Sequence, residues 1–219
     1  MEPVALGLGR LGLTPNALTV IGFLIAGVAA AAAAAQWWLA AGLLVVVGGT
    51  FDLFDGALAR ATGKVSKLGA FMDSTFDRWG EGVIYVGVVV GCLADDFRLG
   101  AALAAAAMAS AVMVSYTRAK AESLGFTPGS GMANVGLAPR EVRIVILTIG
   151  LILTGIQGTA NPLLRLQTYS LPGGIEVALP WAGQVWLMWS LGLIAVLATI
   201  TTIQRIIHTI NQASSQEQE

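Results

Sequence analysis

Six apolar segments of about 20 residues alternate with short polar breaks along the chain, and each is long enough to cross a hydrocarbon core of about 30 Å as a helix. We expect these helices at about residues 15–35, 39–60, 66–94, 100–122, 138–156 and 183–208. The shorter apolar stretch at 1–13 is expected to lie at the membrane surface as a helix. The pattern predicts an all-α integral membrane protein with six transmembrane helices and a short N-terminal interfacial helix, in one domain over residues 1–219.

The composition supports a membrane protein. Hydrophobic residues make up 56% of the chain, charged residues 11%, and the mean hydropathy is +0.76. A soluble domain carries about 25% charged residues, roughly twice as many. The net charge of −1 creates no field that would attract nucleic acid, so no nucleic-acid partner is expected.

Positive charges predict the orientation, because cytoplasmic loops and helix ends carry an excess of Lys and Arg. If the loop near residues 61–66 is cytoplasmic, Arg98 and Arg165 lie on the outer side, and Arg78 lies inside a helix. Nine basic residues then lie on the cytoplasmic side: Arg10, Arg60, Lys64, Lys67, Arg118, Lys120, Arg140, Arg143 and Arg205. We expect a multi-pass protein of the cell (inner) membrane, with both termini and the active site facing the cytoplasm and an outer loop at residues 158–182.

Four aspartates stand out in this apolar chain. Asp52 and Asp55 are three residues apart, and Asp73 and Asp77 are four apart, so each pair shares one helix face. The polar segment TGKVSK separates the pairs, which suggests two antiparallel helices joined by a loop near both acidic faces. Four close carboxylates cannot all stay ionised without cations, and oxygen-only ligands favour Mg²⁺ or Mn²⁺.

The residues from 52 to 77 fit the signature D-x2-D-G-x2-A-R-x8-G-x3-D-x3-D in every residue type and spacing. The stretch thereby resembles the CDP-alcohol phosphatidyltransferases. The resemblance implies a homodimeric membrane enzyme that moves a phosphatidyl group from a CDP-diacylglycerol-type lipid to an alcohol and releases CMP. It implies that Asp52, Asp55, Asp73 and Asp77 hold the metals, and that Asp77 is also the general base.

The same resemblance implies a CDP-lipid site beside the aspartates. The family's first-helix motif P-[ND]-x2-T is met by Pro15, Asn16 and Thr19, although helix capping alone could also explain Asn16 and Thr19. Small side chains at Gly56 and Ala59 would let a nucleotide lie against the second helix. The full set of expected CDP-lipid contacts is Asn16, Thr19, Gly56, Ala59, Arg60 and Ser66.

Four basic residues at the cytoplasmic ends of the fourth and fifth helices are candidates for binding the acceptor. Arg118 and Lys120 diverge by about 200° on a helix, whereas Arg140 and Arg143 share a face. Topology anchoring is the simpler explanation. However, SYTRAKAE with the later R-x2-R resembles the phosphatidylinositol phosphate synthases, apart from an exchanged order of Arg118 and Lys120. That resemblance implies that these residues bind the phosphate of a phosphorylated alcohol, with inositol 1-phosphate favoured over glycerol 3-phosphate or serine.

Other classes of function stay open at this point. The aspartates could form a structural ion-pair cluster with Arg60 and Arg78, although intramembrane ionisable residues are usually functional. A divalent-cation transporter would need polar residues at mid-depth in the helices at 15–35 and 183–208, which are almost wholly apolar there. A non-catalytic lipid-binding scaffold would not need four aspartates.

Overall fold

The computed structural model describes residues 2–126, 135–160, 168–171, 175–178 and 182–216. The described elements are α1 (Glu2–Arg10), α2 (Pro15–Ala34), α3 (Trp38–Ala61), α4 (Lys67–Ala94), α5 (Arg98–Ser123), α6 (Arg140–Ala160), β1 (Thr168–Leu171), β2 (Ile175–Ala178) and α7 (Ala182–Gln216). The expected surface helix and the six expected long helices are all present. Arg165, which entered the orientation argument, lies outside the described residues.

Local capping sets the helix starts that the sequence predicts. Thr14 precedes α2, and its Oγ1 accepts a hydrogen bond from the Ala17 N–H at 3.2 Å, with Pro15 at the first helical position. Ser66 precedes α4 in the same way, and its Oγ accepts from the Gly69 N–H at 3.0 Å. Each capping side chain satisfies a backbone donor that the first helical turn leaves without a partner.

The expectation of a plain loop at residues 158–182 was wrong for its described parts. Helix α6 continues to Ala160, and β1 pairs antiparallel with β2, with Thr168 opposite Ala178 and Leu171 opposite Ile175. The flanking prolines and glycines suggested a loop. The alternating residues of TYSL and IEVA around Pro-Gly-Gly are a hairpin signal that this interpretation overlooked.

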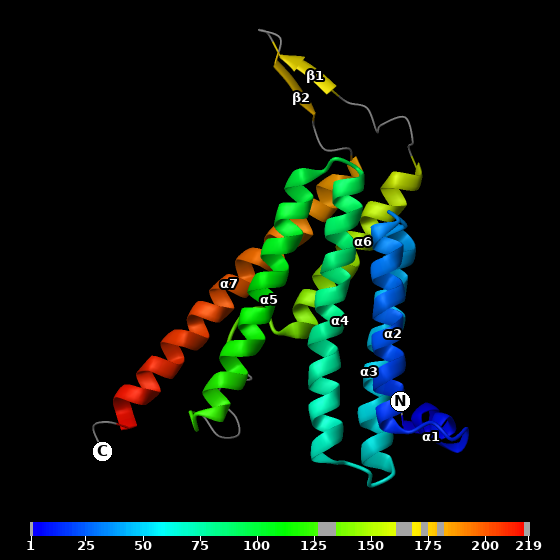
Figure 1. The fold of residues 1–219 in the computed structure, drawn as a ribbon, viewed down its shortest axis with the longest axis vertical. Helices are drawn as coiled ribbons and strands as arrows, with labels where there is room; N and C mark the ends of the chain where they lie inside the picture. Colours follow the sequence, from blue (N-terminus) through cyan, green and yellow to red (C-terminus); the bar gives the residue numbers. More distant parts are fainter. Residues whose placement is uncertain (1, 127–134, 161–167, 172–174, 179–181, 217–219) are drawn as a thin grey trace.

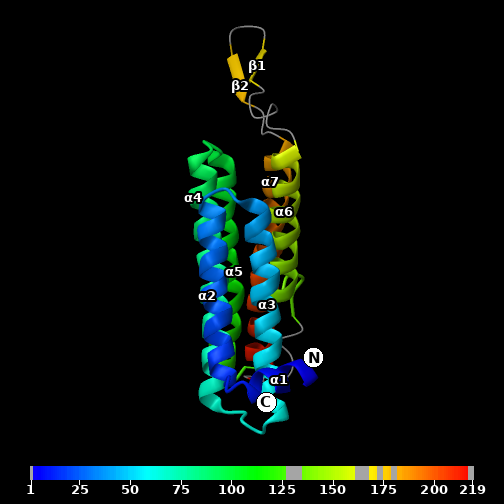
Figure 2. The same cartoon turned by 90° about the vertical axis from the view of Figure 1, so that its right-hand side faces the viewer.

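The long helices form a bundle with distinct ends (Figure 1). Helix α2 packs against α3 and α4, α5 packs against α4 and α7, and α6 packs against α3 and α7. The α3–α4 connection, α1 and the C-terminal end of α7 lie at one end, and the β1–β2 hairpin projects from the other (Figures 1 and 2). We call the first of these the α1 end of the bundle.

Helices α2, α3, α5, α6 and α7 are each long and apolar enough to cross a membrane. Helix α4 has a comparable length of 28 residues, but beyond Lys67 it carries four charged residues: Asp73, Asp77, Arg78 and Glu81. Large apolar side chains are exposed around the bundle, as a lipid-facing surface requires. The membrane bundle is therefore all-helical and multi-pass, and the β1–β2 hairpin lies outside it. Five helices qualify as spans, and the predicted count of six is reached when α4 also crosses the membrane.

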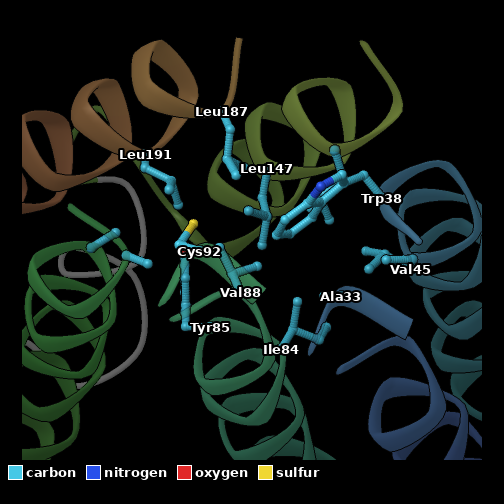
Figure 3. Close-up of a cluster of buried hydrophobic side chains, with 14 of the residues drawn as sticks. Ala33, Trp38, Val45, Ile84, Tyr85, Val88, Cys92, Leu147, Leu187 and Leu191 are labelled. Carbon is cyan, nitrogen blue, oxygen red and sulfur yellow. The ribbon is translucent and has the colours of Figure 1, made fainter. Parts of the chain in front are cut away.

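The apolar core lies where α2, α3, α4, α5, α6 and α7 meet (Figure 3). Trp38, Tyr85, Cys92, Leu147 and Leu191 are all buried there. Small residues let the backbones of α2 and α4 approach closely. A Cβ atom added to Gly87 would lie 2.7 Å from Ala30 Cα and closer still to its carbonyl oxygen. Glycine at this position is thus a packing requirement of the α2–α4 contact.

Gly87→Ala should therefore lower the thermal stability of the detergent-solubilised protein. Overpacking a tight contact typically costs about 1–3 kcal/mol, which exceeds the gain in helix propensity from Gly to Ala. Gly82 is the matched control on the same helix, since a Cβ there meets nothing within 4 Å. Gly82→Ala should leave the melting temperature unchanged or raise it. Equal effects of both substitutions would refute the packing explanation.

Candidate active site

The four aspartates lie at the α1 end of the bundle, two near the C-terminal end of α3 and two in the first turns of α4. Asp52 interacts electrostatically with Asp55, Asp73 and Asp77, and Asp73 does so with Asp55 and Asp77. Because α3 and α4 both pack on α2, the short loop between them brings the two acidic pairs together. The structure thus gathers the four predicted metal ligands into one cluster.

Arg140, at the start of α6, lies between two of these carboxylates. Its Nη2 is 2.9 Å from Asp52 Oδ2, and its Nη1 is 2.8 Å from Asp77 Oδ2. The Arg140 side chain is 29% exposed, so one edge of this arrangement remains accessible. Within the described ranges, no three Asp, Glu, His or Cys side chains form a ready-made metal cage. Asp52 and Asp77 are directed toward the guanidinium instead.

Asp55 is buried and has a different partner. Thr19 Oγ1 on α2 donates to Asp55 Oδ2 at 2.6 Å, and the same hydroxyl lies 3.2 Å from the Pro15 carbonyl oxygen. A hydrogen bond to a buried carboxylate offsets part of the cost of removing that charge from water. The role of Thr19 is therefore not limited to helix capping, because its hydrogen bond to Asp55 connects α2 to the acidic cluster.

A cavity of about 280 Å³ opens between α2, the end of α3 and the start of α4. It is bordered by Asp55 and Asp73. Its lining includes every residue expected to contact the CDP-lipid: Asn16, Thr19, Gly56, Ala59, Arg60 and Ser66. The structure brings all six to one cavity beside the aspartates. Their contact with a ligand stays a prediction.

Not all residues that line this cavity were predicted as contacts. Lys64 and Gly69 also line it. A Cβ at Gly69 would lie 3.1 Å from Ser66 Oγ and 3.4 Å from Asn16 Oδ1, so glycine keeps the wall between these polar groups open. The position of Gly69 in the signature was a usable signal. Lys64 could have been inferred from its place two residues before Ser66.

A second, narrow cavity of about 40 Å³ lies on the other side of the acidic cluster. It is lined by residues of α2, α3, α4 and α6, among them Asp52, Asp77, Glu81 and Arg140. Thr19 borders both cavities. The aspartates therefore stand between two hollow regions, one formed by α2, α3 and α4 and one reaching α6.

Arg143 is placed differently from Arg140. Its side chain is 1% exposed, and it forms a bidentate ion pair with Glu81 of α4, at 2.8 Å from Nε to Oε1 and 2.7 Å from Nη2 to Oε2. Its Nη1 donates to the Ala138 carbonyl oxygen at 2.9 Å. Sequence reasoning did not single out Glu81. Its position four residues after Asp77, on the same helix face, could have indicated it.

Arg118 and Lys120 of α5 do not touch the four clustered aspartates in the described contacts. Arg118 Nε pairs with Glu122 at 2.8 Å, both side chains being partly exposed, and Lys120 is exposed. Arg205 of α7 was read only as a topology signal. It is 4% exposed, donates from Nε to the Val135 carbonyl oxygen at 3.0 Å, and interacts electrostatically with Arg118 and Arg143. Positive charge from α5, α6 and α7 thus gathers near the α1 end of the bundle.

The fold and the site together define a class: a multi-pass helical membrane protein with a carboxylate cluster and an adjoining cavity near one end. Residues 12–201 match the family model described as CDP-alcohol phosphatidyltransferase. The chain belongs to the CDP-alcohol phosphatidyltransferase family, which confirms the resemblance carried by residues 52–77. Membership decides against the transporter and scaffold alternatives and makes the protein an enzyme.

The chain is similar to individual enzymes of this family. The archaetidylinositol phosphate synthase of Pyrococcus horikoshii is 40% identical over 72% of this chain and 79% of its own length. The phosphatidylinositol phosphate synthase of Streptomyces avermitilis is 34% identical over 99% of this chain and 80% of its own. The phosphatidylinositol phosphate synthase of Mycobacterium tuberculosis, solved with CDP-DAG bound, superposes with a TM-score of 0.75 at 26% identity, covering 95% of this chain and 92% of that one. Another structure of that enzyme contains manganese and citrate.

The Thr19–Asp55 contact generates a prediction about stability. Thr19→Val keeps the shape of the side chain but removes the hydroxyl donor, which leaves the buried Asp55 carboxylate without this partner. We expect a loss of about 1–3 kcal/mol, seen as a lower melting temperature in detergent. Thr19→Ser, which keeps the hydroxyl, should retain most of the stability. A Val variant as stable as the Ser variant would show that this hydrogen bond contributes nothing.

Proposed function

We propose that this enzyme transfers the phosphatidyl group of a CDP-diacylglycerol-type lipid to inositol 1-phosphate, forming phosphatidylinositol phosphate and releasing CMP. The single observation that carries the proposal is the position of Arg140, a cation at the edge of the four-aspartate cluster and across it from the 280 Å³ cavity. The activities named for the similar proteins support the same acceptor. We propose that the whole chain, residues 1–219, acts as one domain.

The residues present fit a divalent cation. Four carboxylates supply only oxygen ligands, and Arg140 offsets one negative charge, so the cluster retains an excess of negative charge. We propose that Asp52, Asp55, Asp73 and Asp77 hold Mg²⁺ or Mn²⁺. Such an ion, when bound, would offset the negative charge of the pyrophosphate and of the leaving CMP.

The other residues take roles according to their position. The cavity residues Asn16, Thr19, Gly56, Ala59, Arg60 and Ser66 would hold the cytidine nucleotide. The acceptor hydroxyl attacks the phosphorus nearer the lipid, its proton passes to the Asp77 carboxylate, and the bond to CMP breaks with the electron pair leaving on CMP. Arg140, with Arg118 and Lys120 adding positive charge from α5, would bind the phosphate of the acceptor.

Arg143 was predicted to contact that phosphate as well. In the structure its guanidinium is engaged with Glu81 and Ala138, so direct contact would require this buried pair to open. Glycerol 3-phosphate is the second candidate acceptor, because its phosphate could use the same arginine. Serine has no phosphate and would leave Arg140 without its proposed ligand.

We further propose a homodimer in the cell (inner) membrane, with the site and both termini facing the cytoplasm. The described N- and C-terminal helices end at the α1 end of the bundle, which also holds the aspartates, in agreement with the distribution of basic residues (Figure 1). The dimer is supported by the family resemblance. Membrane lipids would surround the exposed apolar faces of the helices.

The direct test is CMP release by purified protein supplied with CDP-diacylglycerol, inositol 1-phosphate and Mg²⁺. A chelator should abolish release, and added Mg²⁺ or Mn²⁺ should restore it, because the site offers only carboxylate ligands. Full activity after exhaustive chelation would contradict the metal role. Release that requires glycerol 3-phosphate in place of inositol 1-phosphate would contradict the proposed acceptor.

Asp77→Asn should reduce turnover by at least ~100-fold if Asp77 accepts the hydroxyl proton. The substitution is nearly isosteric, so the protein should still extract as a folded species of unchanged size. Steady-state kcat with saturating substrates is the measurement. Turnover close to that of the unmodified enzyme would remove Asp77 from the role of base.

Arg140→Gln should raise the KM for inositol 1-phosphate by about 10- to 100-fold, since a charge-assisted contact to a phosphate contributes roughly 1.5–3 kcal/mol. The KM for the CDP-lipid should change little, because that substrate occupies the cavity formed by α2, α3 and α4. Arg98→Gln is the control, an exposed arginine at the other end of the bundle whose partner is Asp96. An unchanged acceptor KM in Arg140→Gln would exclude the phosphate contact.

A further inference from the structure

We infer that Glu81 is a positioning residue for the acceptor site: through its buried pair with Arg143 it fixes the start of α6 and so holds Arg140 beside Asp52 and Asp77. The inference rests on the proposed function, because it gives Arg140 the task of binding the acceptor phosphate. Glu81 lies outside the family signature at 52–77, and the sequence analysis assigned it no role.

Two ion pairs, one turn apart, connect α4 with α6. We call Asp77–Arg140 the outer pair and Glu81–Arg143 the inner pair. Asp77 pairs with Arg140 at 2.8 Å, and Glu81 pairs with Arg143 at 2.7 Å. Both acids come from one face of α4 and both arginines from one face of α6. Helix α4 packs mainly on α2 and α5, whereas α6 packs mainly on α3 and α7. Long side chains, rather than close backbone packing, therefore set the relation between α4 and α6 at the site.

The two ion pairs differ in exposure, and this difference suggests different roles. Arg140 and Asp77 are 29% and 17% exposed, whereas Arg143 and Glu81 are 1% and 4% exposed. Nε, Nη1 and Nη2 of Arg143 each donate to a protein oxygen, so three of its five N–H groups are already engaged, and its 1% exposure keeps the guanidinium away from a ligand. Separating the inner pair is costly in free energy, because it would leave two buried charges without partners. The outer pair is accessible to a ligand.

The inner pair also fixes the chain that leads into α6. The Ala138 carbonyl oxygen accepts from Arg143 Nη1 at 2.9 Å. On the opposite side, Thr201 Oγ1 of α7 accepts from the N–H groups of Leu137 and Ala138, both at 3.0 Å. Glu81 of α4 and Thr201 of α7 thus hold residues 137–143 from two directions. Arg140 lies within this segment, so the position of its guanidinium relative to Asp52 and Asp77 depends on how the segment is held.

The test uses the full-length enzyme with Glu81→Gln, Arg143→Gln and the double variant that carries both substitutions. We expect each single variant to raise the KM for inositol 1-phosphate about 10-fold or more, because small displacements of a positioning group are costly. The KM for CDP-diacylglycerol should stay within about twofold. The double variant should be no worse than the poorer single variant, since both residues act through one pair.

A single variant could fail to fold, because each leaves one buried charge without a partner. The double variant avoids this, having two neutral amides in place of the pair, and it should still show the raised acceptor KM. Glu81→Asp keeps the charge on a shorter side chain and should recover part of the loss. Arg98→Gln, at the far end of the bundle, serves as the control with unchanged kinetics.

Three results would overturn the inference. If Arg143 contacts the phosphate directly, Arg143→Gln raises the acceptor KM while Glu81→Gln leaves it unchanged or lowers it. If the pair is only structural, melting temperatures fall while both KM values stay constant. If both KM values rise together, the pair does not act on the acceptor. Failure of the proposed function is seen separately, as a wild-type enzyme that prefers another acceptor, and the same variants are then assayed with that acceptor.

Discussion

Charge compensation in a low-dielectric surrounding is the constraint on which this structure depends. Five acidic side chains lie near one end of an otherwise apolar bundle, and several of them have a specific partner: Asp52 and Asp77 have Arg140, Asp55 has Thr19, and Glu81 has Arg143. Buried charges without partners are costly. The requirement therefore holds α2, α3, α4 and α6 together at one place and defines where the site can form.

This arrangement separates the two sides of the proposed reaction. The cavity proposed for the nucleotide is formed by α2, α3, α4 and the loop between α3 and α4, and most of its lining residues are small or polar. The cation proposed to bind the acceptor phosphate is Arg140 of α6, across the acidic cluster. Because α6 is held to α4 by the Glu81–Arg143 pair, the geometry between the substrates would be set by a contact that touches neither of them.

Much of this organisation could be predicted from the sequence, and the limits have physical causes. Helix positions followed from the apolar lengths, and the caps that the structure shows at Thr14 and Ser66 act within one turn of the chain. Of the cavity residues, Gly56, Ala59 and Arg60 followed from a signature confined to 26 consecutive positions, and Asn16 and Thr19 followed from the motif at residues 15–19. The Glu81–Arg143 pair joins residues 62 positions apart and depends on how helices pack, which hydropathy does not encode. The buried setting of Arg205 escaped prediction for the same reason.

The central claim is that the positive charge of α6 selects an acceptor carrying a phosphate. It is tested most directly by comparing CMP release from CDP-diacylglycerol with inositol 1-phosphate and with free inositol, using the unmodified enzyme at acceptor concentrations below KM. We predict that kcat/KM for inositol 1-phosphate is higher by at least ~10-fold, the lower bound expected from one charge-assisted phosphate contact. Equal or better use of free inositol would contradict the account and return Arg140 to a purely structural role.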